Sequence, residues 1–181
     1  MAEICPETPA DEPEVEALYD LCFAPGRTAL SSYRLREGVA RVAPLCLVLR
    51  GEDGILKAAI RYWPVRVGGQ PVLLLGPIAV HPTAQGEGLG ALLMRDSLAR
   101  ARKLGWSRVL LVGDLPYYNR FGFARLDRVE MPPPTNPDRV LGLALVPGAG
   151  RGVGGEVERA PATDAAAAQA LRGDCVEVPE R

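Results

Sequence analysis

The first part of the chain changes from helical to strand-like hydrophobic patterning. Apolar residues at helical spacing predict a helix over Glu12–Phe23, which the Pro25-Gly26 pair ends. A second short helix is predicted over residues 30–38, because a glycine closes that stretch. Residues 2–5, ahead of both helices, have the pattern of a short strand. The chain is therefore expected to begin with one strand and two helices.

Three apolar runs with short polar connections follow, over residues 45–49, 55–67 and 72–80. Asp-Gly and Gly-Gly dipeptides in the two connections are typical of hairpins, so the three runs are predicted to form an antiparallel meander. Proline lacks the N–H group that a strand ladder needs. We therefore expect a break or bend at Pro64 and interrupted pairing at Gly76-Pro77.

An amphipathic helix dominates the middle of the chain. It is predicted over residues 88–104, behind a loop at 81–87, with leucines on its apolar face and arginines on its polar face. After it come a strand over 108–112, a short aromatic helix over 115–121 and two strands over 123–131 and 140–146. These elements complete a predicted domain over residues 1–147.

Glycine and alanine dominate residues 148–181. This stretch is predicted to be a C-terminal extension of the domain. It offers an edge strand near residues 154–159 and one marginal helix within 160–173, because a short alanine run is a weak helix in water. The last 20 or so residues are expected to be loosely held.

Composition narrows the classes of function. Basic residues number 21 and acidic residues 22, so the net charge of −1 makes no electrostatic case for a nucleic-acid partner. The single histidine, His81, excludes metal sites built from several histidines, and no metal is expected. The apolar runs are far shorter than the roughly 20 residues that a membrane helix needs, so no membrane partner is expected.

The cysteines are not expected to carry chemistry, and the arginines leave an acidic substrate open without any cluster that demands one. No C-x-x-C pair is present, which excludes zinc-ribbon and thioredoxin-like sites. The acidic N-terminus lacks the apolar core of a signal peptide, so a cytoplasmic protein with reduced thiols is expected. Only Lys57 and Lys103 are lysines; the other 19 basic residues are arginines, which we expect mostly on the surface.

The segment from the third strand of the meander into the long helix predicts an anion site. Backbone N–H groups of a glycine-rich loop and of a helix N-terminus point at one spot, which suits a pyrophosphate. Gly86-x-Gly88-x-x-Ala91 also fits the dinucleotide fingerprint, which leaves an oxidoreductase open. Against that alternative, five residues separate the strand from Gly86, and antiparallel strands precede it. A plain tight turn is the third interpretation.

Two motifs resemble those of the GNAT superfamily of N-acetyltransferases. Gln85-Gly86-Glu87-Gly88-Leu89-Gly90 matches its (Q/R)-x-x-G-x-(G/A) motif, and Gly113–Phe123 is similar to the G-D-x-x-Y-Y-x-R-F-G-F segment of a bacterial subgroup. The resemblance covers roughly residues 2–146. It implies an α/β (α+β) fold with a mixed, mostly antiparallel sheet of about 6–7 strands and about 4 flanking helices. The sheet would splay between its fourth and fifth strands.

The resemblance also implies acetyl-CoA as co-substrate. The pantetheine arm would pair with the backbone of the strand before the loop, and the pyrophosphate would rest on the loop amides. Carried onto this sequence, the pantetheine residues are Ile78, Ala79 and Val80, and the pyrophosphate residues are Gln85, Gly86, Glu87, Gly88, Leu89 and Gly90. Gly76-Pro77 gives a local reason for the splay, since a proline there leaves backbone groups for a ligand to pair with.

Tyr118 stands where the resemblance places the general acid. Such an acid is needed because CoA leaves as a thiolate, which a phenol can protonate. The general base is less evident. Asp114 is a candidate and equally a helix N-cap, and Glu37 is a candidate if the second helix lines the substrate cleft. His81 titrates in the useful range but sits in a Val-His-Pro turn, which favours a loop-packing role.

The resemblance implies transfer of an acetyl group to the amine of an unidentified small molecule or peptide, by direct attack in a ternary complex. A non-catalytic acyl-CoA-binding or sensor module is the alternative from another class, and the lack of an evident base favours it. A homodimer is compatible with the sequence, which carries no signal for or against it.

Overall fold

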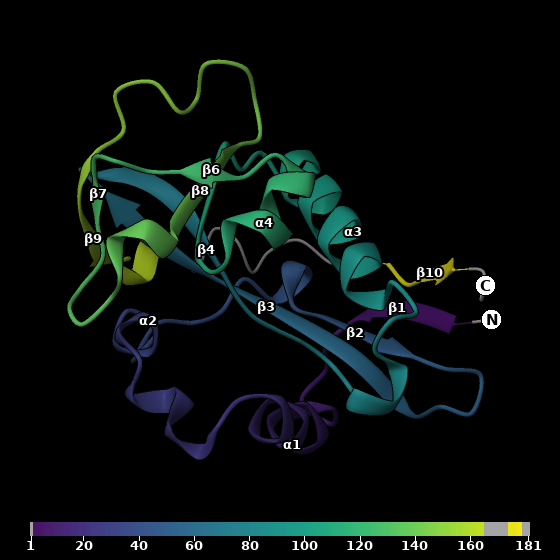
Figure 1. The fold of residues 1–181 in the computed structure, drawn as a ribbon. Coiled ribbons are helices and arrows are strands. Elements are labelled where there is room, and N and C mark those ends of the chain that lie inside the picture. Colours follow the sequence, from purple (N-terminus) through teal and green to yellow (C-terminus); the bar gives the residue numbers. More distant parts are fainter. Residues whose placement is uncertain (1, 165–173, 179–181) are drawn as a thin grey trace.

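A mixed, mostly antiparallel sheet forms the centre of the computed structural model, which describes residues 2–164 and 174–178 (Figure 1). Its strand order is β10-β1-β2-β3-β4-β5-β8-β6, and β9 joins β3 and β7 beside this path. The strands are β1 (Ala2–Pro6), β2 (Leu47–Arg50), β3 (Leu56–Val67), β4 (Gln70–Val80), β5 (Arg108–Val112), β6 (Ala124–Arg125), β7 (Val129–Glu130), β8 (Val140–Ala144), β9 (Gly155–Arg159) and β10 (Val176–Val178). Only the β4–β5 and β7–β9 pairs are parallel among them.

Helices cover both faces of the sheet. They are α1 (Glu12–Cys22), α2 (Ser31–Arg34), α3 (Leu89–Lys103) and α4 (Leu115–Tyr118), with 3₁₀ turns between several elements. α3 lies on one face and α1 and α2 on the other (Figure 1). The largest core forms under α3, where Leu93 and Met94 pack with Ile60 and Tyr62; α1 packs Val15 against the opposite face. Within the described residues, no helix combines the length and apolar character that a membrane span requires.

The expected fold class and the antiparallel meander are confirmed, and the splay lies where it was predicted. β4 pairs with β5 only at Leu73 and Leu74. Past that point Gly76 has a φ of +124°, and the β3–β4 register shifts opposite Gly76-Pro77. The strand count exceeds the expected 6–7 because several two- and three-residue strands extend the sheet at its margins.

The break expected at Pro64 is wrong, since β3 continues through it. β3 and β4 join through a two-residue turn whose closing pair is Val67 and Gln70. Pairs in an antiparallel ladder alternate between hydrogen-bonded and non-hydrogen-bonded, so Pro64 and its partner Leu73 are a non-hydrogen-bonded pair. The missing N–H therefore points away from β4, and neither β2 nor β9 pairs with residue 64.

The single strand expected over residues 123–131 is also wrong. The chain forms two short strands there, β6 and β7, which pair with β8 and β9 respectively. Leu126 lies between them and packs over Gly142, where an added Cβ would come within 2.6 Å of a Leu126 methyl carbon. The chain thus changes its pairing partner on either side of Leu126, from β8 to β9.

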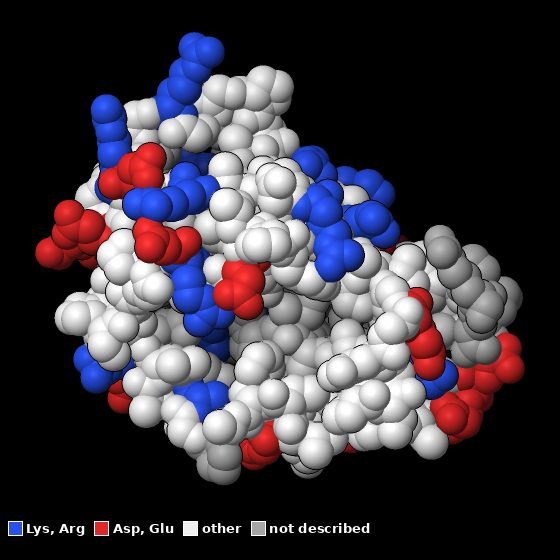
Figure 2. Space-filling view, in the orientation of Figure 1, with Lys and Arg blue, Asp and Glu red and all other residues white. Residues whose placement is uncertain are grey.

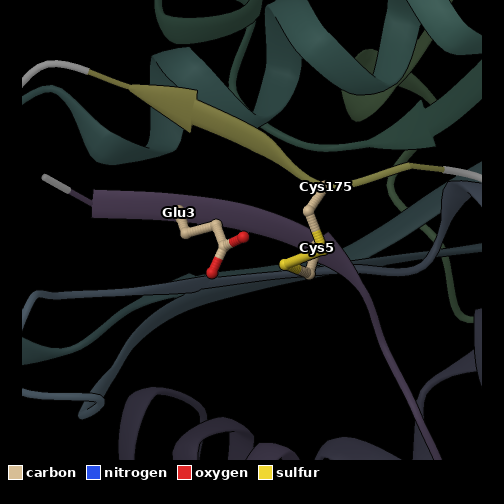
Figure 3. Close-up of side chains that lie close together, drawn as sticks. All are labelled: Glu3, Cys5 and Cys175. Carbon is tan, nitrogen blue, oxygen red and sulfur yellow. A yellow bond between two sulfur atoms is a disulfide. The ribbon is translucent and has the colours of Figure 1, made fainter.

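The described part of the tail is bound to the N-terminal strand, which corrects for residues 175–178 the expectation that the last 20 or so residues are loosely held. β10 pairs antiparallel with β1, and the register of Ile4 with Val176 places Cys5 opposite Cys175. The two form a disulfide with their Cα atoms 4.2 Å apart, which corrects the expectation of reduced thiols for this pair, whereas Cys22 and Cys46 are free (Figure 3). Glu3 lies beside the disulfide, whose sulfurs are bonded to each other. Residues 165–173, most of the helix expected within 160–173, lie outside the described residues.

Candidate active site

The glycine-rich loop connects the end of β4 to the start of α3. Gly86 and Gly88 have φ values of +88° and +79°, a region that disfavours any residue with a Cβ. Gly88 is the N-cap of α3 and offers no side chain to its first N–H groups, which remain available to an anion. A cavity of about 700 Å³ lies at this point, lined by residues 86–89, with Glu87 among them, and by Lys57 and Arg95. The uncapped helix N-terminus is thus the feature of the loop that suits an anion.

Two other loop residues have structural reasons for their identity. A Cβ on Gly90 would lie 3.1 Å from the Tyr117 hydroxyl oxygen and 3.3 Å from a Val80 methyl, so a small residue suits this close approach of α3. The Gln85 side-chain amide donates to the Val80 carbonyl over 3.4 Å. His81 contacts its own turn, where Nδ1 lies 2.7 Å from the Thr83 hydroxyl, in line with its expected loop-packing role.

The expected pantetheine residues lie on β4 past its last pair with β5. Ile78, Ala79 and Val80 pair with β3 along one edge, and in the described structure no strand pairs with their other edge. The carbonyl of Pro77 accepts a hydrogen bond from the Tyr19 hydroxyl at 3.3 Å, which fixes the bulge from the α1 side. β4 therefore presents a supported, open edge to a ligand.

Tyr118 lies on α4 at the mouth of this splay. Its ring rests directly on the backbone of Gly113, where a Cβ would be 2.3 Å from ring carbon Cε2, and it meets Phe123 edge-on at 5.9 Å. It lines a cavity of about 150 Å³ together with Gly76, Pro77 and Ile78. Burial raises the pKa of Tyr118 to about 12, so the phenol stays protonated at neutral pH. Its hydroxyl has no hydrogen-bond partner among the described residues.

The structure separates Asp114 from the cavity that Tyr118 lines. The Asp114 carboxylate is 76% exposed and pairs with Arg139 at 3.2 Å. Asp114 occupies the N-cap position of α4, but its side chain makes no capping hydrogen bond; its carbonyl accepts from Tyr117 and Tyr118 instead. Glu37 lines a neighbouring cavity, where its carboxylate is 78% exposed and lies 3.6 Å from Arg159.

That neighbouring cavity, of about 610 Å³, is rich in arginine. It lies between α1, α2 and the sheet and is lined by Arg27, Arg34, Arg36, Arg41 and Arg61, with Glu16 and Glu37 as the lining carboxylates. Figure 2 shows this side of the molecule hollowed between α2 and α4, with lysine or arginine atoms beside the hollow. The sequence expectation of surface arginines is wrong here: Arg27, Arg36 and Arg61 expose 7%, 9% and 3% of their surface.

Glu16 connects two of these buried arginines. Its carboxylate accepts hydrogen bonds from Arg27 and from Arg61. Burial opposes the charge of Glu16, but these two hydrogen bonds outweigh burial and lower the pKa of the carboxyl. Arg61 also pairs with Glu7 at 2.6 Å. Glu16 is therefore held ionised as a structural anion and is a poor candidate for the base.

Sequence reasoning missed Arg36, which lines both cavities. Its guanidinium carbon lies 4.3 Å from the centre of the Tyr33 ring and 4.7 Å from that of Trp63. The three-residue spacing of Tyr33 and Arg36 is a weak signal in a predicted helix. The contact of Arg36 with Trp63 joins residues far apart in the chain, and no sequence pattern predicts it.

Comparison with protein families agrees with this geometry. Residues 13–123 match the model of the acetyltransferase (GNAT) family. An N-acetyltransferase of Escherichia coli, YhbS, is 31% identical over 119 residues, which cover 65% of this chain and 70% of YhbS. A second E. coli N-acetyltransferase, YjhQ, is 40% identical over 50 residues, 28% of each protein.

Solved structures show the same likeness. The crystal structure of E. coli YhbS in complex with CoA has a TM-score of 0.76 and 28% identity, and the match covers 90% of this chain and 92% of that one. A GNAT acetyltransferase from Brucella melitensis, in complex with acetyl-CoA, has a TM-score of 0.66 and 29% identity, covering 91% and 99%. The dinucleotide alternative fails, because an antiparallel hairpin precedes the glycine loop. The chain belongs to the GNAT family of acetyltransferases.

Proposed function

We propose that this protein transfers the acetyl group of acetyl-CoA to an amine by direct attack in a ternary complex. The observation that carries the proposal is the Tyr118 hydroxyl. It is protonated at neutral pH, lacks a partner among the described residues, and lines a cavity at the splay of β4 and β5.

Two segments of the chain would hold acetyl-CoA. The open edge of Ile78, Ala79 and Val80 would pair with the pantetheine amides, and residues 85–90 would hold the pyrophosphate. The fit rests on the positive φ of Gly86 and Gly88 and on the uncapped N-terminus of α3. The CoA-bound and acetyl-CoA-bound relatives lend support to this assignment.

The chemistry needs a proton removed from the amine and a proton delivered to the sulfur. As the new C–N bond forms and the C–S bond breaks, the Tyr118 hydroxyl would donate its proton to the departing thiolate. Glu37 or solvent would take the proton from the amine. Glu37 has more support than Asp114, because Glu37 lines a cavity next to Tyr118 and Asp114 lines neither.

Replacement of Tyr118 by Phe tests the proposal. The change should lower kcat for thiol release by about 10²-fold, the lower end of what a general acid contributes, while acetyl-CoA affinity measured by calorimetry stays the same. Tyr117→Phe is a matched control, because Tyr117 is the adjacent phenol and does not line the splay cavity. Unchanged kcat in Tyr118→Phe would remove Tyr118 from the mechanism.

A non-catalytic acyl-CoA sensor is the second candidate. The observation that favours it is the absence of any carboxylate among the described residues that line the cavity beside Tyr118. The same assay separates the two functions. Binding of acetyl-CoA without thiol release for any amine would support the sensor.

A further inference from the structure

We propose that the acetyl acceptor is a small amine that also carries a carboxylate, of the amino-acid class, and that Arg36 binds this carboxylate. The inference rests on the proposed function and names its substrate class. Arg36 exposes 9% of its surface, and its Nε and Nη1 atoms are buried without a hydrogen-bond partner among the described residues. A buried charge without a partner is unusual, because burial of an unpaired ion is costly.

The surroundings of Arg36 supply stacking but no counter-charge. Its guanidinium carbon lies over the rings of Tyr33 and Trp63, at 4.3 and 4.7 Å from their centres. Such contacts stabilise a cation without neutralising it, and leave its Nε and Nη1 groups to an oxyanion. No carboxylate of the described residues lies within ion-pair distance of it. Burial lowers the pKa of Arg36 to about 10, so the side chain is still charged at neutral pH.

The other buried arginines of the site are already neutralised. Arg27 pairs with Glu16 and Asp20, and Arg61 pairs with Glu7 and Glu16. None of these carboxylates pairs with Arg36, whose Nε and Nη1 atoms have no hydrogen-bond partner among the described residues. A ligand that brings one negative group would give Arg36 the kind of partner that Arg27 and Arg61 already have.

The position of Arg36 fits an acceptor rather than CoA. The cavities on either side of it are the one that Tyr118 lines and the arginine-rich one that Glu37 lines. Its Nη2 atom lies 3.7 Å from where a Cβ would stand on Gly76, at the splay of the sheet. The cradle expected for pyrophosphate forms a separate cavity at Gly88, lined by other residues. A carboxylate on Arg36 would thus lie next to the transfer point while the phosphates bind elsewhere.

The size of the cavity that Tyr118 and Arg36 line suits a small acceptor. Its volume of about 150 Å³ corresponds to roughly five waters at their share of the liquid volume. Charge, size and position together point to a molecule that holds its amine and its carboxylate a few bonds apart.

Matched pairs of amines test the proposal on the full chain. Alanine, leucine and phenylalanine are each compared with their amides and their decarboxylated amines, with acetyl-CoA as donor and thiol release as the readout. Wild-type kcat/KM should favour the carboxylate member at least tenfold for the best-fitting side chain. Arg36→Met, which keeps the length of the stem, should remove that preference, and Arg36→Lys should keep part of it. Arg151→Met is the control, since Arg151 is exposed and lines neither cavity.

Calorimetry supplies a second readout that does not need turnover. N-acetyl amino acids and their amides are titrated into the protein with CoA present, and the carboxylate form should bind at least tenfold more tightly to wild type but not to Arg36→Met. Acetyl-CoA binding by each variant shows that it is folded.

The outcomes separate this inference from the proposed function. Turnover without a carboxylate preference, or a preference that Arg36→Met leaves intact, overturns the inference while acetyl transfer stands. If the carboxylate probes bind through Arg36 but no amine gives thiol release, the anion site at Arg36 stands and acetyl transfer is ruled out. If the protein shows no turnover with any amine and no carboxylate probe binds through Arg36, the inference is overturned.

Discussion

Gly113 carries a prediction that the sequence motif alone would not explain. Its φ is not in the positive range, so an alanine would meet no backbone strain. The obstacle is the Tyr118 ring: a Cβ on Gly113 would stand 2.3 Å from Cε2 and 2.9 Å from Cδ2. Carbon atoms prefer to be about 3.5 Å or more apart, so Gly113→Ala should push the ring away by about 1 Å. Gly113 is therefore a positioning residue for Tyr118.

A shift of this size should be visible in catalysis. Misplacement of a catalytic group by about 1 Å can cost about 10²-fold in rate, which corresponds to about 2.7 kcal/mol of transition-state stabilisation. We expect Gly113→Ala to lower kcat by about 10- to 100-fold without changing acetyl-CoA affinity. Overpacking should also cost about 1–3 kcal/mol of folding free energy, so kcat is measured well below the melting temperature of the variant.

Two comparisons show whether Gly113 acts through Tyr118. Gly150→Ala is the control, because a Cβ there meets only an ordinary contact of 3.8 Å with Ala144. In a Tyr118→Phe background, Gly113→Ala should lower kcat little further, since the hydroxyl that it misplaces is already absent. Equal losses from Gly113→Ala in the two backgrounds, or wild-type kcat in the single variant, would refute the positioning role.

Three other predictions follow from the structure. Burial raises the pKa of Tyr118 to about 12, so kcat should stay level from pH 7 to about 10, where an ordinary phenol is half ionised; a basic limb near pH 9 that Tyr118→Phe abolishes would contradict this. Gly88→Glu adds a carboxylate at a φ of +79° and should abolish acetyl-CoA binding in calorimetry; retained affinity would move the pyrophosphate elsewhere. Cys175→Ser opens a disulfide between residues 170 apart and should lower the free energy of unfolding by about 2–5 kcal/mol. An unchanged midpoint of unfolding in urea would argue against a stabilising disulfide.

Local patterning predicts the parts of the fold that local interactions determine. The limits of α1 and β5 agree with the sequence expectation to within one residue, because apolar periodicity and flanking turns define both. Pro64 shows where this reasoning fails. Whether a proline disrupts a strand depends on which way its missing N–H faces, and the turn of the β3–β4 hairpin sets that direction.

The prediction for the C-terminal tail was wrong for a related reason. Val176–Val178 is too short to predict as a strand, and its stability comes from pairing with β1 at the other end of the chain. The disulfide of Cys5 with Cys175 has the same origin, since no spacing rule connects residues 170 apart. Contacts of this kind are set by the assembled sheet rather than by neighbouring residues.

In the candidate site, too, local motifs are predictable from the sequence and distant contacts are not. Residues 85–90 and Tyr118 stand in contiguous motifs, and the sequence therefore predicts them. Asp114 belongs to the same motif as Tyr118, but its carboxylate turns outward to Arg139, a partner that the motif does not contain. Proximity in sequence to a catalytic residue does not place a side chain in the same cavity.

The bulge at Gly76-Pro77 connects both halves of the site. It ends the pairing of β4 with β5, and so leaves an open edge for a ligand on one side. An added Cβ at Gly76 would meet the Arg36 Nη2 atom at 3.7 Å, which is an ordinary contact. The requirement for glycine comes from the backbone, since the φ of +124° disfavours a Cβ. Any larger residue at position 76 should therefore strain the bulge, and with it both the open edge of β4 and the cavity that Arg36 lines.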